Sequence, residues 1–409
     1  MTQLTVPVAS DVLYVGEEST YGTAATTAFA EHVQGSAKPK LSQTEIEKNS
    51  ASARLFAQKT TVQGLKSTDS GIAFAVHMKP ASSVLDTGAT ASTPYLGTLL
   101  ECLLGGEYAA AGSTVSGGSA TTTSIPVQTG HGTRFRIGTV VAVEVASVRY
   151  FRAVVNIATD TLSVWPALPS APANGDDVLN GYSYFLTQSN SKSLTIEHSH
   201  TVPSADAETI QRRLLGCTGG LSLEVGQNNL AQFGFDLRAA DWAYGSLSVS
   251  SAVGSETMAD PIAITNAIVY LQPAATTTDS HVCTTNIGAT FNTGMTHLKC
   301  LAGVQGTKGV ARMGGRDSGE FTIRTLVDTD NYTRWSAQTL LRMLMIFESG
   351  SGNSKRAGSV FANRVQIVGD PVEVEEGGFL YQDVRVRPVL DTSLAVDTAA
   401  GAPYVIGLA

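Results

Sequence analysis

Residues 219–238 read GGLSLEVGQNNLAQFGFDLR. Apolar side chains occupy every second position on both sides of a Gly-Gln-Asn-Asn turn at residues 226–229, a pattern typical of a β-hairpin with one buried face. We therefore predict a sheet protein whose core is covered by this hairpin. The side chains expected to face that core are Leu221, Leu223, Val225, Phe233, Phe235 and Leu237.

Alternating segments also precede this hairpin. Residues 60–65 alternate, residues 193–198 have strand character, and residues 71–78 alternate most regularly. In the last segment one face carries all the large apolar side chains, which are Ile72, Phe74, Val76 and Met78. Several strands of one sheet are therefore expected on either side of residue 100.

One segment before the hairpin has helical periodicity instead. Thr93 is a suitable N-cap, Pro94 suits the first helical position, and the pair Gly105-Gly106 ends the segment. Leucines recur at intervals of three and four residues and form a single stripe of Leu96, Leu99, Leu100, Leu103 and Leu104. The sequence predicts a helix that flanks the sheet with its leucine stripe inward.

Residues 109–180 have a different composition. A linker rich in Gly, Ser and Thr at 112–124 leads into short strand-like segments at 140–145, 148–157 and 162–165, followed by a Pro-rich stretch. Short strands bounded by turns indicate a small barrel or sandwich. We interpret these residues as a small all-β domain inserted into its host domain as an exterior decoration.

The second half of the chain repeats the order strand, strand, helix, hairpin. Asp-Ser-Gly precedes an alternating strand at residues 69–71 and again at 317–319. In the second half we expect strand character in residues 287–302, an alternating strand over 321–327, a helix over 331–347 that Asp330 caps and Gly350 ends, and a hairpin of 365–374 with 381–389. The predicted division is an N-terminal arm at 1–40, a first repeat at 41–108 and 181–245, the insert at 109–180, and a second repeat at 246–409.

Composition narrows the classes of function. Charged residues are only 15% of the chain, and the net charge is −8, so a protein that grips nucleic acid through clustered Lys and Arg is disfavoured. A surface with few charges suits a subunit that copies of itself cover. No apolar run approaches the roughly 20 residues that span a bilayer, and no secretory signal precedes the first strands.

Several segments together resemble the major tail tube proteins of long, non-contractile-tailed bacteriophages (siphophages). They are EESTYGT at 17–23, LLECLLG at 99–105, SLTIEH at 193–198, and Gly216-Cys217 leading into the hairpin at 221–225. The resemblance covers residues 10–108 and 181–395 and depends on order and spacing. It implies a mainly β fold: a duplicated tail-tube fold, which is a two-sheet β-sandwich or barrel with a flanking helix, plus the small inserted all-β domain.

The resemblance also implies a function. The chain would be a structural subunit that assembles in the host cytoplasm and polymerises as stacked rings in the virion tail, around a channel through which DNA passes during genome ejection. With two repeats per chain, three copies would form a pseudo-hexameric ring. The implied partners are the chain itself, the tape measure protein in the lumen, the terminator, the distal tail protein and, transiently and non-specifically, DNA. Membrane insertion is not expected.

Two groups of residues carry the specific expectations. The N-terminal arm is expected to clamp onto the adjacent ring, gaining order on assembly, through Tyr14, Glu17, Tyr21 and Gly22. An acidic lumen lining that repels phosphates is expected from Glu45, Glu47, Asp69, Glu224, Asp317, Glu320, Glu373 and Glu375. The alternative for these carboxylates is an ordinary solvated strand face.

No catalytic, cofactor or metal site is predicted. The chain has no Gly-x-Ser-x-Gly elbow and no phosphate-binding Gly-rich motif, and its four cysteines lack zinc-ligand spacing. Arg312, Arg316, Arg324 and Arg334 are interpreted as inter-subunit salt-bridge residues. Two alternative functions stay open: another phage structural part such as a distal hub or decoration protein, and a carbohydrate-binding or hydrolytic β-protein.

Overall fold

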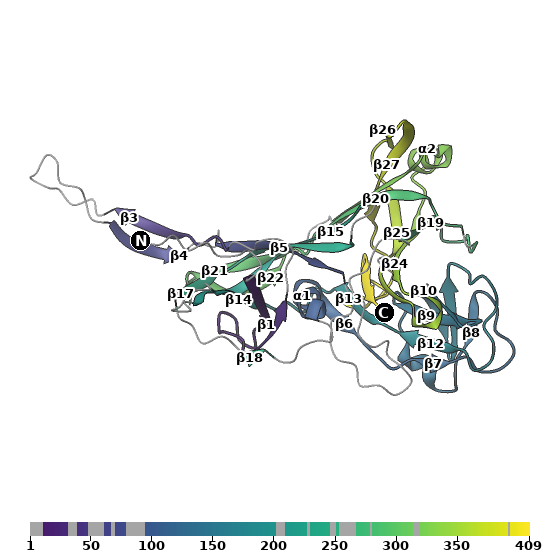
Figure 1. The fold of residues 1–409 in the computed structure, drawn as a ribbon, viewed down its shortest axis with the longest axis horizontal. Helices are drawn as coiled ribbons and strands as arrows, with labels where there is room; N and C mark the ends of the chain where they lie inside the picture. The colour runs from purple at the N-terminus through teal and green to yellow at the C-terminus, as the bar shows by residue number, and fades with distance from the viewer. Residues whose placement is uncertain are drawn as a thin grey trace, which may run out of the picture.

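The computed structural model is a mainly β protein (Figure 1). It describes residues 11–31, 39–47, 61–66, 70–78, 95–201, 209–226, 230–245, 251–252, 267–278, 280–313, 319–391 and 393–409. The mainly β class predicted from the sequence is confirmed.

A long antiparallel layer organises the molecule. Its strands lie in the order β5 (Gly71–His77), β16 (Gln232–Arg238), β15 (Thr209–Gly226), β20 (Thr284–Phe291), β23 (Gly319–Leu326), β27 (Phe379–Pro388) and β26 (Val372–Glu376). The predicted hairpin is the β15–β16 pair, and its six expected core side chains are all buried. We call this set of strands the long layer.

Two further sets of strands cover the buried face of the long layer. The first set contains β2 (Thr27–Glu31), β1 (Asp11–Glu17), β14 (Leu194–Thr201), the N-terminal part of β15, and β17 (Asp241–Gly245), with β18 (Ser251–Ala252) beside β2. The second set contains β6 (Gly105–Tyr108), β13 (Tyr182–Leu186), β28 (Val405–Leu408), β25 (Arg356–Ile367), β24 (Leu341–Ser349) and β19 (Ala267–Pro273). A single hydrophobic core joins all of them.

The helix α1 (Tyr95–Leu104) lies within that core. The predicted leucine stripe is buried along its whole length, and the helix ends before Gly105, which has a φ of 89°. The proposed cap at Thr93 lies outside the described residues. The predicted flanking helix is thus present, and its leucines fill the space between the strands.

The same order of antiparallel pairing occurs twice along the chain. In the first half β1 pairs with β14, β14 with β15, β15 with β16, and β16 with β5. In the second half β19 pairs with β24, β24 with β25, β25 with β27, and β27 with β23. A two-stranded hairpin precedes β5 and β23 alike: β3 (Gln43–Glu47) with β4 (Thr61–Lys66), and β21 (Met295–Val304) with β22 (Thr307–Arg312).

The insert forms a separate six-stranded sheet with its own core. Its strands lie in the order β7 (Ser113–Thr114), β12 (Asp177–Asn180), β9 (Val140–Val145), β10 (Val148–Ala158), β11 (Thr161–Trp165) and β8 (Ser124–Pro126). Phe151 and Trp165 of the insert pack against Tyr270, Leu344 and Phe361 of the host. Because β6 and β13 pair at its base, the chain leaves and re-enters the host at one place.

The predicted helix over 331–347 is wrong in its second half. The helix α2 spans Thr329–Ser336, is capped by Asp328 rather than Asp330, and is followed by the strand β24. The strand is apolar on both faces: Met343 and Met345 lie in the main core, whereas Leu344 and Ile346 lie against the insert. A strand buried on both faces gives a continuous apolar run, which has no period of two to distinguish it from a helix stripe.

An aromatic cluster under the long layer gives a test of this core. The ring centroids of Phe291 and Tyr404 lie 4.9 Å apart, and those of Phe291 and Phe321 lie 5.6 Å apart. We expect Phe291→Ala to lower the free energy of unfolding by about 3–5 kcal/mol, measured by urea denaturation, because it leaves a cavity in a packed core. The control Phe291→Leu should cost no more than about 1.5 kcal/mol. Equal losses for the two variants would contradict this placement.

Candidate functional site

The long layer has one buried face and one face that points away from the core, which we call the open face. Small residues dominate the open face in the rows that cross β5, β16, β15 and β20. The strand register and the alternation of burial assign to it Ala73, Ala75, His77, Gln232, Gly234, Asp236, Arg238, Gly220, Ser222, Glu224, Asn286, Gly288, Thr290, Glu320, Thr322, Arg324, Asp383, Arg385 and Arg387. This surface is polar, with small side chains interspersed among larger charged ones.

Charges of both signs lie on the open face. The Arg324 guanidinium donates from Nε to Oδ1 of Asp383 at 2.7 Å and from Nη2 to Oδ2 at 3.0 Å, and it also pairs with Glu376 at 2.9 Å. These hydrogen bonds, that to Asp383 first, raise the pKa of Arg324. Arg387 pairs with Glu320 at 3.3 Å. The open face is thus a mixed surface that is partly neutralised by its own ion pairs.

The predicted acidic lining is only partly gathered on this face. Glu224 and Glu320 lie on it, from β15 and β23. Glu373 and Glu375 lie on the other face of β26, where Glu373 accepts a hydrogen bond from the Tyr332 hydroxyl at 3.1 Å.

The remaining carboxylates of the predicted set are elsewhere. Glu45 is exposed on the β3–β4 hairpin, and Glu47 ends β3. Asp69 and Asp317 lie outside the described residues. Glu45, Glu373 and Glu375 therefore do not lie on the open face, and the lumen-lining role of the eight carboxylates stays a prediction.

The predicted basic cluster is also engaged within the chain. Arg324 holds the ion pairs described above, and Arg334 pairs with Asp330 at 3.4 Å. Arg312 donates to the backbone carbonyl oxygens of Leu103 and Thr293. Arg316 lies outside the described residues. Arg324 and Arg334 thus have intrachain ion-pair partners, and their role as inter-subunit salt-bridge residues stays a prediction.

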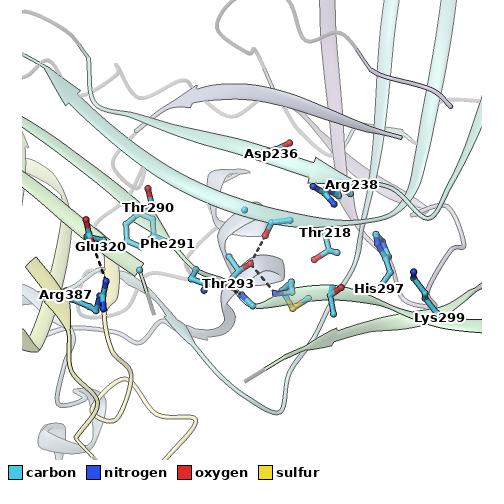
Figure 2. A pocket seen from close by; sticks show the side chains of 17 residues that line it. Thr218, Asp236, Arg238, Thr290, Phe291, Thr293, His297, Lys299, Glu320 and Arg387 are labelled. Carbon is cyan, nitrogen blue, oxygen red and sulfur yellow. Dashed lines mark hydrogen bonds and ion pairs between the residues drawn. The ribbon is translucent and has the colours of Figure 1, made fainter. Parts of the chain in front are cut away.

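A hollow of about 820 Å³ lies at one end of the open face, where β20 turns into β21 (Figure 2). Arg238 and Asp236 line it from β16, and His297 and Lys299 line it from β21. His297 is half-buried with its Nε2 2.8 Å from the carbonyl oxygen of Gly216, and burial lowers its pKa. Cationic side chains outnumber carboxylates among the lining residues of this hollow.

The expected N-terminal arm is part of the sheet over residues 11–17. β1 pairs with both β14 and β2, Leu13 and Val15 are buried, and Tyr14 lies opposite Glu197 in the register. The expectation of an extended arm that gains order only on assembly is wrong for these residues. Their alternation is short, and the partner strand β14 lies far along the sequence, so the local pattern gave too weak a signal.

The loop after β1 is held by a buried carboxylate that sequence reasoning did not single out. Glu18 accepts four hydrogen bonds, from the backbone N–H groups of Gly22 at 2.8 Å and Gly216 at 2.7 Å, and from the hydroxyls of Ser193 at 2.7 Å and Thr195 at 3.1 Å. Burial nevertheless raises its pKa. Most of its partners lie far away in sequence, so no local motif could have identified this role.

Tyr21 extends the same attachment. Its hydroxyl donates to Oγ1 of Thr307 at 2.7 Å, and its ring lies 6.4 Å from that of His297, between centroids. Gly216, with a φ of 63°, makes room for the ring, since a Cβ there would lie 2.9 Å from it. Residues 17–22 are thus fixed against β15 and the β21–β22 hairpin.

Glu17, the remaining predicted arm residue, belongs to a charged cluster. Lys192 pairs with Glu17 at 3.0 Å and with Glu101 of α1 at 2.6 Å. Burial alone would lower the pKa of Lys192, but its hydrogen bonds to Glu101 and Glu17 outweigh that effect and raise it. Burial raises the pKa of Glu107 to about 7, and the neighbouring Glu101 adds to the shift.

The two borders of the long layer differ from its interior. Among the described residues, β26 pairs with β27 alone, and β5 has on its outer side only the isolated bridge from Lys40 to Gly71. By contrast the middle of the layer is continuous, because β20 of the second repeat pairs with β15 of the first. Within the described residues, the outer backbone groups of these two borders are therefore available to pair with a further strand.

Comparisons with known proteins add no identification. No protein-family model matches this chain, and no curated protein matches it in sequence. Within the described part of the chain, no group of three or more His, Cys, Asp or Glu side chains is arranged to hold a metal. In the same residues no helix has both the length and the apolar character needed to cross a bilayer.

The four hydrogen bonds of Glu18 predict a large loss of stability when its side chain is removed. Glu18→Ala leaves buried backbone and hydroxyl donors without their acceptor, and we expect it to lower the free energy of unfolding by about 3 kcal/mol in urea denaturation. The neighbouring exposed residue supplies the control, since Ser19→Ala should change stability by less than about 0.5 kcal/mol. Similar small effects for both variants would show that the four contacts do not hold the loop.

The raised pKa of Glu107 predicts that replacing this carboxyl by an amide stabilises the fold in a pH-dependent way. A carboxyl whose pKa rises from 4.5 to about 7 on folding destabilises the fold as the pH rises through that interval. We expect Glu107→Gln to be more stable than the wild type by about 1–2 kcal/mol at pH 8, which discounts the full shift for partial exposure. The gain should vanish near pH 4.5. A gain that does not depend on pH in urea denaturation would contradict the assignment.

Proposed function

We propose that this chain is a structural subunit of a bacteriophage tail tube, which polymerises as stacked rings around a channel for DNA. The observation that carries the proposal is the long layer. It combines one buried face, one open face with many small polar residues, and two borders that the described chain leaves open. The sequence resemblance to siphophage tail tube proteins points to the same function.

The joint between the two repeats supports closure by further copies. Inside the chain, β15 of the first repeat gains a neighbour because β20 of the second repeat pairs with it from Leu221↔Phe291 to Gly226↔Asn286. In the second repeat, the position equivalent to the last part of β15 is taken by the end of β25 and by β26. Both of these segments pair with β27. No described strand covers the outer side of β26. In the proposed ring, the first repeat of the next copy supplies that strand.

If the strand pairing that joins the two repeats within one chain also joins neighbouring copies, the copies form a ring. A head-to-tail contact that closes on itself gives a ring, and a sheet closed in this way has no exposed edges. Because each chain contributes two repeats, three copies supply six and form a pseudo-hexameric trimer. The open face would then line the channel, in contact with the tape measure protein and afterwards with passing DNA, while the terminator and the distal tail protein cover the ends of the tube in the virion tail.

The chemistry of the open face suits transient passage. Its glycines, alanines and hydroxyl side chains lie among larger charged side chains, and two of its four arginines, Arg324 and Arg387, pair with carboxylates of the same chain. Clusters of unpaired Lys and Arg side chains bind DNA phosphates. Pairing arginines with carboxylates weakens such binding, so the channel surface need not consist of acidic residues alone. The proposed role is structural and requires no catalytic group.

Electron microscopy of the purified protein tests the proposal. At high protein concentration we expect hollow rings, or tubes of stacked rings, whose class averages show three copies and a pseudo-sixfold outline. The insert should project outward from the wall, since it packs on the face away from the long layer. A chain that stays monomeric at every concentration would falsify the proposal, and discrete rings that never stack would favour another phage structural part.

A further inference from the structure

The β26–β27 hairpin carries an unusual concentration of negative charge. Residues 368–383, which include β26 and the first half of β27, read VGDPVEVEEGGFLYQD, with no Lys or Arg and five carboxylates, of which Glu376 and Asp383 pair with Arg324. The same hairpin exposes large apolar side chains: Phe379 is 66% exposed and Val372 is 52% exposed. Exposed apolar groups next to charges of one sign are typical of a contact surface. We call this hairpin the acidic tip.

The β21–β22 hairpin has the opposite character. Residues 292–313 read NTGMTHLKCLAGVQGTKGVARM and contain no Asp or Glu. His297 and Arg312 contact backbone carbonyl oxygens, whereas Lys299 and Lys308 are exposed. Apolar side chains are exposed here too, with Leu298 at 46% and, directly after the hairpin, Met313 at 67%. We call this hairpin the basic ribbon.

The two surfaces lie at opposite ends of the same strands. The basic ribbon connects β20 to β23 at the end where Phe291 pairs with Gly319. The acidic tip extends past the other end of β23, where Leu326 pairs with Tyr381. Figure 1 shows β26 and β27 well separated from β21 and β22. The two surfaces lie at opposite ends of strands that pair with one another, so a contact between them requires two copies.

We infer that the acidic tip of one copy docks on the basic ribbon of another copy, and that this contact stacks one ring on the next. The inference rests on the proposed tube, and it adds which surfaces meet and by what chemistry. A head-to-tail contact between different patches at the two ends of a subunit propagates along an axis when its rotation does not close into a ring. Closure within a ring uses the outer backbone edge of β26, whereas stacking uses side chains of the same hairpin, so this hairpin serves both contacts.

The physical roles within this contact differ. Exposed ion pairs contribute little affinity each, but complementary charge steers association and rejects wrong orientations. Affinity then comes from covering the apolar side chains, Phe379 above all. The hollow described above adjoins the basic ribbon through His297 and Lys299, and it offers space for an aromatic ring beside cationic groups.

Charge reversal tests the pairing. One variant carries Glu373→Lys with Glu375→Lys, a second carries Lys299→Glu with Lys308→Glu, and a third combines all four changes. Glu376 is left unchanged because it pairs with Arg324 inside the chain. Tube formation is followed by light scattering and electron microscopy at low salt, with the insert substitution Glu144→Lys as a control for a charge change elsewhere.

The expected result is a rescue. Each variant that reverses the charge of one surface should raise the protein concentration needed for tubes at least about tenfold, while single rings still form. The variant that reverses both surfaces should return this concentration to within about threefold of the wild type. The effect of the single reversals should shrink as salt rises, since screening weakens exposed charge pairs. Phe379→Ser should impair stacking at every salt concentration, because its contribution is apolar.

The alternative outcomes are distinguishable. If the wild type forms tubes and the single reversals stack as well as Glu144→Lys, the contact is overturned while the tube function stands. If both single reversals block stacking but the combined variant does not recover, these two surfaces do not meet each other. If the wild type forms neither rings nor tubes, the proposed function itself fails.

Discussion

A strand at the border of a sheet carries N–H and C=O groups that need partners, and this requirement shapes the whole molecule. The chain meets it in two ways. β15 is long enough to serve two layers: its first part pairs with β14 and β17, and its last part pairs with β16 and β20. β25 does the same in the second repeat, with β24, β28 and β27. Among the described strands of the long layer, the ones paired on one side only are β26 and, apart from the bridge at Gly71, β5.

Sharing one strand between two layers requires a bend and a close approach of backbones. Gly216 supplies the bend in β15 with a φ of 63°, a conformation that costs a side chain more than it costs glycine. A Cβ on Gly219 would lie 2.0 Å from the carbonyl oxygen of Asp236 on the neighbouring strand. The bend is then held by Tyr21 and Glu18, so the first strand of the chain and the middle of β15 stabilise each other. This coupling explains why residues expected to form a separate arm belong to the body.

Local periodicity predicted the elements that have one buried face. The β15–β16 hairpin and the leucine stripe of α1 both repeat at the period of their structure, and both are present. Periodicity failed for β24, whose apolar residues serve two cores, and for the carboxylates of β26, whose face depends on the register with β27. It could not reveal Glu18, whose function is set by partners from other strands. The periodicity of a sequence indicates which face of a single strand or helix is buried. The candidate site depends instead on which strands the topology places next to one another.

The distribution of charge follows from the same distinction between interior and ends. In the middle of the open face, Arg324 and Arg387 are matched by carboxylates on adjacent strands, so their fields cancel over a few ångströms. Towards the two hairpins the charges are less evenly matched: residues 368–383 contain five carboxylates and no Lys or Arg, of which Glu376 and Asp383 pair with Arg324, and residues 292–313 contain no Asp or Glu. Like charges confined to one hairpin repel one another and weaken an isolated subunit. Every copy also carries a hairpin of the opposite charge. In the proposed tube, this hairpin offsets the repulsion when two copies meet end to end.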